Sequence, residues 1–147
     1  MYKHFLVATD GSALSKKAVR SAIDLAISLD AQLTVLNVVP RYPISYYEGG
    51  MVVSMDDVAR TEKLWSDDAQ NLVNVVRDAA MTKGIKAKGI VMQSGEVAES
   101  IIAAAKKHKC DLVVMASHGR KGIKRVLLGS ETLHVLTHST VPVLVLR

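Results

Sequence analysis

The chain has 147 residues, of which 49% are apolar and only 4% aromatic, and it carries a formal net charge of +5. This length gives one domain, residues 1–147, with enough core to fold without disulfides or a structural metal, and it leaves no room for a second domain. The apolar content argues against disorder, and no apolar run approaches the roughly 20 residues needed to span a bilayer.

The first apolar run and the single cysteine indicate where in the cell the protein is expected. Lys3 and Asp10 interrupt that run before a secretory signal could develop, and Cys110 has no partner for an internal disulfide. We therefore expect a cytoplasmic protein with no membrane association. Because Cys110 precedes an apolar run, we interpret it as inert core.

Five short runs rich in Val, Ile and Leu predict β-strands. They cover residues 5–9, 33–39, 89–93, 111–117 and 141–147. The runs are nearly continuous in apolar residues, which is typical of parallel strands covered on both faces. Between them, apolar residues at three-and-four spacing predict four helices.

The predicted helices follow the strands in turn. The first runs from Ala18 to Leu29 with Ser12 as its N-cap, and the second runs from Leu64 to Ala80 and ends near Gly84. The third spans Val97 to Ala105, and Leu133 with Leu136 marks a short fourth. This alternation predicts an α/β fold: a single open five-stranded parallel sheet with helices on both faces and right-handed crossovers.

Ligands in such sheets bind at the carboxyl ends of the strands, where the strand order reverses. The loops after the first and fourth strands, which begin at Thr9-Asp10 and Ser117-His118, are the expected walls of that crevice. Asp10 lies at its mouth as a candidate ligand contact. An Asx turn or a helix cap beside Gly11-Ser12 is the alternative for its carboxylate.

The stretch from Met115 to Ser130 carries features of a phosphate site. Gly119 can adopt positive φ or let a ligand approach the backbone, and Gly129-Ser130 can open a helix whose free N–H groups face an anion. The Ser130 hydroxyl can donate to a phosphate or cap its own helix. An ordinary surface loop would look similar, and neither G-x-x-x-x-G-K-[ST] nor G-x-G-x-x-G is present, which disfavours P-loop and dinucleotide enzymes.

Other candidate sites are weaker. Asp10, Ser117 and His118 are the residue types of a nucleophilic triad, but no nucleophile elbow is present and adjacent strand residues project in different directions. His134 and His138 have a metal-binding spacing without the H-E-x-x-H pattern, so we expect exposed helix positions. Trp65 and Met51 or Met55 are expected to pack and not to bind a ligand.

The segment 40–55 is the longest irregular stretch, and it contains three tyrosines, two prolines and paired glycines. Loops of this length are often functional. A lid over the crevice and a partly packed crossover both remain open for it.

Four motifs in order resemble the universal stress protein family, specifically its nucleotide-binding branch. They are "VATDGS" after the first strand, "CDLVVMASHGRKG", "VLLGS" and the closing "VPVLVLR". The match runs from the first strand to the last residue, and only the segment 40–55 has no clear counterpart. The resemblance implies a Rossmann-like fold of the adenine nucleotide alpha hydrolase type.

The family's nucleotide motif is glycine, two residues, glycine, nine residues, then glycine with Ser or Thr. This chain matches it at Gly119, Gly129 and Ser130 and departs from it at Ala116. If Ala116 has ordinary φ and its Cβ points away from the ligand, we expect binding to survive, whereas positive φ would cost about 1 kcal/mol or more.

The resemblance also implies roles for individual residues. Asp10, with Thr9 beside it, would contact the ribose or a phosphate-bound Mg²⁺, and the backbone of Val38 would bind the adenine edge. The remaining implied contacts, to ribose and phosphates, are Ala116, Ser117, His118, Gly119, Arg120, Gly129, Ser130 and Glu131.

The resemblance implies a stress-response sensor or regulator that binds ATP, with Mg²⁺ as a candidate companion and at most slow hydrolysis, because no general base is identifiable. It also implies a homodimer through the C-terminal strand, where Pro142 suits an edge. A dimeric interaction module without nucleotide binding is the first alternative.

Two other classes of protein share part of this pattern: phosphoacceptor domains and nucleic-acid-binding proteins. A phosphoacceptor domain needs an Asp at the end of the third strand and a Lys after the fifth, and this chain has neither. A nucleic-acid binder is suggested only by basic clusters at 16–17, 106–109 and 120–125, without a recognised binding motif.

Overall fold

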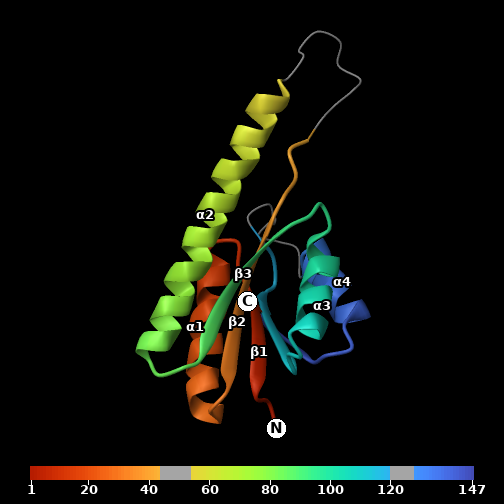
Figure 1. The fold of residues 1–147 in the computed structure, drawn as a ribbon. Coiled ribbons are helices and arrows are strands. Elements are labelled where there is room, and N and C mark those ends of the chain that lie inside the picture. The colour runs from red at the N-terminus through yellow and green to blue at the C-terminus, as the bar shows by residue number, and fades with distance from the viewer. Residues whose placement is uncertain (44–53, 120–127) are drawn as a thin grey trace.

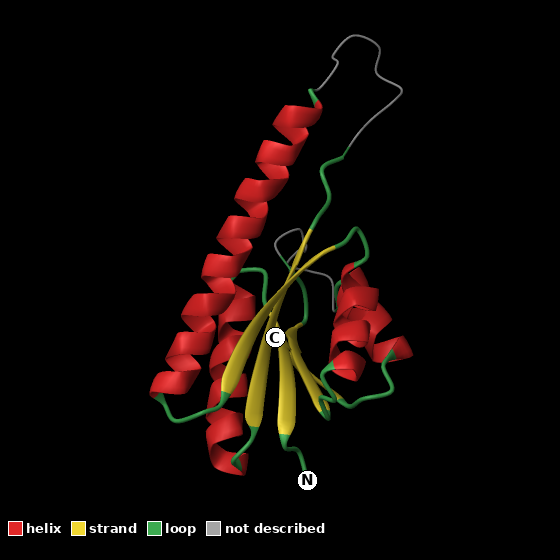
Figure 2. Ribbon diagram, in the orientation of Figure 1, coloured by secondary structure: helices red, strands yellow, loops and turns green. Residues whose placement is uncertain are grey.

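Strands and helices alternate along the chain in a computed structural model that describes residues 1–43, 54–119 and 128–147 (Figures 1 and 2). The strands are β1 (His4–Ala8), β2 (Gln32–Val39), β3 (Ala87–Gln93), β4 (Leu112–Ala116) and β5 (Val143–Leu146). The helices are α1 (Ala13–Leu29), α2 (Met55–Thr82), α3 (Val97–Lys107) and α4 (Ser130–His138). The predicted order of elements is therefore confirmed.

The five strands form one parallel sheet in the order β3-β2-β1-β4-β5. The chain moves outward from β1 to β3 and then crosses to β4 on the other side of β1. The strand order thus reverses between β1 and β4, and the loops that leave these two strands meet at the same edge of the sheet. The predicted fold class is confirmed, including the edge position of β5.

Helices cover both faces of the sheet, α1 and α2 on one and α3 and α4 on the other (Figure 1). Alternate strand residues supply the two cores: Phe5 and Val7 point toward α1 and α2, whereas Leu6 points toward α3 and α4. Aliphatic and alanine side chains fill both layers, as the low aromatic content predicts.

Local signals explain where the first two helices begin and end. The Ser12 hydroxyl accepts a hydrogen bond from the Ser15 N–H at 3.3 Å, which confirms the predicted N-cap of α1. Helix α2 begins nine residues before the predicted Leu64, because Ser54 caps it and acidic residues occupy its first turn. It ends at Thr82, just before Gly84 at φ 84°.

The two leucines that predicted α4 do not face the sheet, and the predicted packing of Met55 is wrong. Leu133 and Leu136, which mark α4 in the sequence, are 55% and 40% exposed, whereas Thr132 and Val135 form its buried face. Met55 is 73% exposed at the start of α2, which extends past the carboxyl edge of the sheet and away from the core (Figure 1). Apolar character alone does not determine which side of a short helix faces the sheet.

No helix within the three described segments is both long enough and apolar enough to cross a membrane.

Candidate functional site

The turn after β1 fixes the Asp10 carboxylate. The Ser12 N–H donates to Asp10 Oδ1 at 2.9 Å, so the Asx turn that the sequence left open is present. Gly11 has φ 79°, a conformation that favours glycine. The buried Thr9 hydroxyl lies 3.0 Å from Ser15 Oγ and accepts from the Gly11 N–H at 3.3 Å. The Thr9 side chain therefore shapes the turn instead of facing the crevice.

Two hydrogen bonds hold the start of α4 against the end of β4. The Gly129 N–H donates to the Ser117 carbonyl at 2.7 Å. The buried Thr132 hydroxyl donates to the Ala116 carbonyl at 2.9 Å. These bonds connect positions that are more than ten residues apart in the sequence, and they set the first turn of α4 beside the switch point of the sheet.

Two glycines lie here where a side chain would have little room. A Cβ on Gly119 would lie 2.8 Å from Asp10 Oδ2, which is closer than real Cβ contacts. A Cβ on Gly129 would lie 3.3 Å from both the Cα of His118 and the Ser117 carbonyl oxygen. The backbone segments 117–119 and 129–130 and the Asp10 carboxylate are thus packed together without intervening side chains.

Gly129 is the N-cap residue of α4, and because glycine has no side chain, this residue makes no side-chain cap. Ser130 is the first helical residue and is exposed. Free N–H groups at a helix N-terminus carry partial positive charge and bind anions. The arrangement therefore provides what a phosphate group needs, at the edge where the fold class positions ligands.

Glu131 does not turn its carboxylate toward this helix terminus. Its Oε2 accepts a hydrogen bond from the Ala98 N–H at 2.8 Å, at the first turn of α3. The N-cap residue of α3, Glu96, makes no side-chain cap of its own. The Glu131 side chain therefore caps a neighbouring helix, and its backbone alone remains at the candidate site.

Ala116 has the ordinary backbone conformation under which we expect nucleotide binding to survive. It is not among the residues with positive φ, and it lies in β4 paired with Leu146. Ala116 is buried, at 7% exposure.

Val38, the residue expected to bind the adenine edge, lies near the end of β2, paired with Met92 and partly buried.

The Ser117 and His118 pair does not support nucleophilic catalysis. Ser117 Oγ lies 3.3 Å from His118 Nδ1, but the serine is buried at 3% exposure. A buried hydroxyl cannot reach the carbonyl of a substrate.

The remaining candidate residues have structural contacts. His134 Nε2 lies 2.9 Å from Glu99 Oε1, and the rings of His134 and His138 are 4.3 Å apart. No group of three or more His, Cys, Asp or Glu residues suited to a metal occurs in the part of the chain that the structure describes. The ring of Trp65 stacks on that of Tyr42 with 6.0 Å between ring centres, so Trp65 packs as predicted. Cys110 is a free, buried thiol.

Some predicted positions lie outside the described residues. These are Arg120 with the other cations of 120–125, and Met51 with most of the segment 40–55.

Thr132 is the residue that sequence reasoning missed. Thr132 is 2% exposed, and its hydroxyl ties α4 to β4. The available signal was its spacing of three from the buried Val135, which puts a polar side chain on the inner side of a short helix.

Comparisons with known proteins place the chain among relatives of one kind. The sequence profile described as "Universal stress protein family" matches residues 1–147. A universal stress protein of Methanocaldococcus jannaschii is 31% identical over 149 aligned positions, covering 100% of this chain and 83% of the relative. The universal stress protein YxiE of Bacillus subtilis is 32% identical, with 100% of both chains covered.

Solved structures give the same result. Universal stress protein UspA from Lactobacillus plantarum superposes with a TM-score of 0.84 at 25% identity, covering 99% of this chain and 98% of that one. A universal stress protein in complex with cAMP has a TM-score of 0.71 at 24% identity, covering 99% and 97%. One from Archaeoglobus fulgidus in complex with dAMP has a TM-score of 0.63 at 16% identity, covering 99% and 98%.

The length of the match, the relatives at 31% and 32% identity and the shared fold agree, and this chain belongs to the universal stress protein family.

Proposed function

We propose that this protein binds an adenine nucleotide, ATP in the first instance, in the crevice between β1 and β4, and acts as a cytoplasmic stress-response sensor or regulator. The observation that carries the proposal is the uncapped start of α4, held beside Asp10 and Gly119 by the bonds to β4. Two structural neighbours in complex with cAMP and dAMP support the adenine chemistry.

The phosphates would bind to main-chain N–H groups. Segments 117–119 and 129–131 converge with no side chain between Gly129 and the Ser117-His118 backbone. A helix N-terminus supplies both oriented donors and a favourable dipole for phosphate oxygens. The Ser130 hydroxyl is exposed beside them and can donate a further hydrogen bond.

The adenine base would bind to the backbone at the end of β2. The Leu36 carbonyl accepts from the Thr9 N–H on the β1 side, and the Val39 carbonyl accepts from the Ser94 N–H on the β3 side. Backbone groups alternate sides along a parallel strand, so Val38 directs its N–H and C=O toward β1. Because β1 ends at Ala8, these groups extend past the paired part of the strand.

The methyl group of Ala116 is compatible with this proposal. The carbonyl of Ala116 already accepts from Thr132, and its side chain is buried in the sheet layer. A nucleotide held by main-chain donors from residue 117 onward does not require glycine at position 116.

Asp10 would contact the ribose or a Mg²⁺ ion that also binds the phosphates. A single carboxylate is typical of nucleotide sites in which Mg²⁺ takes its other ligands from phosphate and water. Because no residue is identifiable as a general base, we propose at most slow hydrolysis.

Calorimetric titration with ATP, ADP and AMP, with Mg²⁺ or with a chelator, tests the proposal. We expect saturable heat and a rise in the unfolding temperature, since a ligand that binds only the folded state stabilises it. Gly129→Ala should weaken binding, because its Cβ would press on Ser117 and His118, whereas Gly95→Ala is the matched control with no atom within 4 Å of its Cβ.

No heat and no thermal shift at millimolar adenylates would overturn nucleotide binding. The chain would then be better described as a protein-interaction module of the same family.

We also propose a homodimer through β5. This strand lies at the edge of the sheet, and an unpaired apolar edge invites pairing with another chain. Leu144 on β5 is exposed, as are Leu133 and Leu136 on α4. Pairing of β5 with its own copy across a two-fold axis would bury the free edge.

Sedimentation equilibrium over a wide concentration range tests the dimer. Leu144→Glu should shift the mass toward the monomer, whereas Leu64→Glu, at another exposed leucine on α2, should not. A monomer mass at every concentration of the unmodified protein would contradict the proposal.

A further inference from the structure

A second hollow lies at the opposite edge of the sheet, at the amino ends of β1, β2 and β3. It has a volume of about 180 Å³ and is lined by His4, Gln32, Leu33, Lys86, Ala87 and Lys88. This edge is remote from the crevice, because parallel strands direct their carboxyl ends the other way. The hollow is therefore independent of the proposed nucleotide site.

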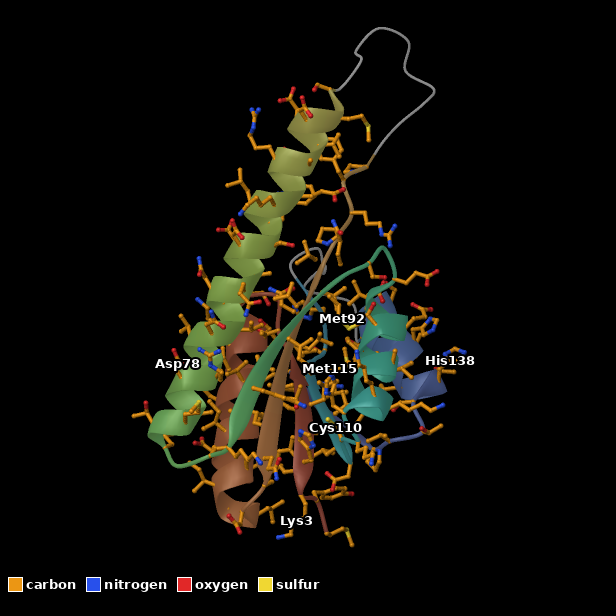
Figure 3. All side chains as sticks on the ribbon, viewed as in Figure 1. Lys3, Asp78, Met92, Cys110, Met115 and His138 are labelled. Carbon is orange, nitrogen blue, oxygen red and sulfur yellow. The ribbon has the colours of Figure 1, made fainter. Side chains whose placement is uncertain are left out.

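Polar side chains from neighbouring strands meet here on the face that α3 covers. Thr34 on β2 is the pairing partner of Lys88 on β3, and His4 Nε2 lies 2.8 Å from the buried Thr34 Oγ1. Lys88 Nζ lies 2.9 Å from Nδ1 of His108, the C-cap residue of α3. Figure 3 labels Cys110 and Lys3 at this end of the molecule.

The two lysines of this cluster, Lys86 and Lys88, have no ion-pair partner in the part of the chain that the structure describes. The neighbouring carboxylate, Asp111, accepts from the main-chain N–H of Lys3 at 2.7 Å and of His4 at 3.0 Å. Two lysines thus line a recess in which an imidazole, not a carboxylate, accepts from an ammonium group.

The surroundings lower the pKa of both histidines. Burial lowers the pKa of His4 from 6.5, and Lys88 and Lys86 lower it further against the opposing effect of Asp111. Burial also lowers the pKa of His108, followed by Lys88, Lys107 and His4. An ammonium group has no acceptor, so His108 Nδ1 must be the acceptor toward Lys88.

The carbonyl end of α3 is a competing explanation for some of these cations. Lys106 and Lys107 lie in its last turn, where positive charge is favourable, and Lys88 contacts the C-cap residue. It does not explain Lys86, which lies just before β3, lines the hollow and forms no ion pair with any residue that the structure describes. Lys86 and Lys88 are both exposed residues that line the hollow, so an anion arriving from solvent can reach them.

We propose that this hollow binds a phosphate group, either free or carried by a small monoester. Lysine ammonium groups bind phosphate as point charges, and the histidine N–H and Gln32 amide supply further donors. The volume of about 180 Å³ is below the roughly 300 Å³ at which pockets for larger ligands begin. The site therefore suits a small anion and not a whole nucleotide.

NMR of the imidazole groups tests the proposal at residue level. Inorganic phosphate is titrated against sodium chloride of equal ionic strength, and glycerol phosphate in a parallel arm distinguishes a monoester from the free ion. We expect saturable shifts of the His4 and His108 signals and a rise in both pKa values. The Lys86→Gln/Lys88→Gln variant should bind phosphate roughly tenfold more weakly or worse, as measured by these shifts.

Two controls separate this site from its alternatives. Lys63→Gln/Lys83→Gln removes the same charge at lysines that pair with Asp67 and Asp24 outside the hollow, and it should titrate like the parent. Gly129→Ala should also leave the response intact, because it affects only the crevice. Shifts no larger than those with chloride, or an unchanged response in the Lys86→Gln/Lys88→Gln variant, would overturn the proposal.

Discussion

The Oδ2 atom of Asp10 lies 2.8 Å from the position that a Cβ on Gly119 would occupy. The loop after β1 and the loop after β4 therefore come close together at these two residues. Gly119 is not among the glycines with positive φ, so the position requires space and not a left-handed backbone.

Gly119→Ala should therefore displace the Asp10 carboxylate while costing less than about 1 kcal/mol of unfolding free energy. We expect adenylate affinity to fall roughly tenfold. Combined with Asp10→Ala in a double-mutant cycle, the two losses should be less than additive, because both act on one carboxylate. Additive losses in calorimetry would contradict this coupling.

Thr132→Val should destabilise the protein by about 1 to 3 kcal/mol, because it leaves the Ala116 carbonyl without its buried donor. Thr137→Val is the matched control: its hydroxyl donates to the Leu133 carbonyl at an exposed position, so its loss should cost less than about 0.5 kcal/mol. Urea denaturation of both variants measures the difference.

Glu131→Ala should remove the acceptor that Ala98 N–H uses at the start of α3, at a cost of about 1 kcal/mol. Glu131→Gln keeps an acceptor oxygen and should recover most of that loss. Adenylate affinity should change little in either variant, since only the backbone of Glu131 lies at the crevice. A large affinity loss with unchanged stability would restore the ligand role that the family resemblance implies.

Stability should decrease as the pH falls below about 6.5, because the folded state lowers the pKa of His4 and His108. Between the unfolded value of 6.5 and the lower folded values, the unfolded chain binds more protons, so acidification favours unfolding. Lys88→Gln should weaken this dependence, since Lys88 lowers both pKa values. Urea midpoints at pH 7.5 and about pH 5.5 give the comparison.

Cys110 should resist alkylation in the folded protein. Burial raises the pKa of its thiol to about 11, so very little thiolate exists near pH 8. Iodoacetamide should modify it only after unfolding in urea, as followed by intact mass. Rapid modification of the native protein would show that this part of the core opens readily.

The fold could be predicted because its signals are local. Runs such as 33–39 and 111–117 are nearly continuous in apolar residues, Ser12 caps α1, and Gly84 follows the end of α2. The true buried face of α4 could not be predicted, because Leu133 and Leu136 are more apolar than Thr132. The hydrogen bond from Thr132 to β4 determines which side faces inward.

The candidate site was predictable in its backbone and less so in its side chains. The positions of Gly119 and Gly129 follow from the motif spacing, and the meeting of their loops follows from the sheet order. The orientation of Glu131 toward α3 depends on a contact 33 residues away in sequence. The hollow at the amino ends of β1, β2 and β3 likewise combines residues that no local sequence pattern brings together, and Lys88 beside it contacts His108 at the end of α3.

The stack of Tyr42 on Trp65 gives the molecule an intrinsic optical reporter. Trp65 is the only tryptophan of the chain, and its ring lies 6.0 Å from that of Tyr42, nearly parallel at 18°. The two rings belong to the chain segments on either side of residues 44–53. The fluorescence of Trp65 therefore reports whether the segment after β2, which carries Tyr42, stays in contact with the first half of α2, and no added dye is needed.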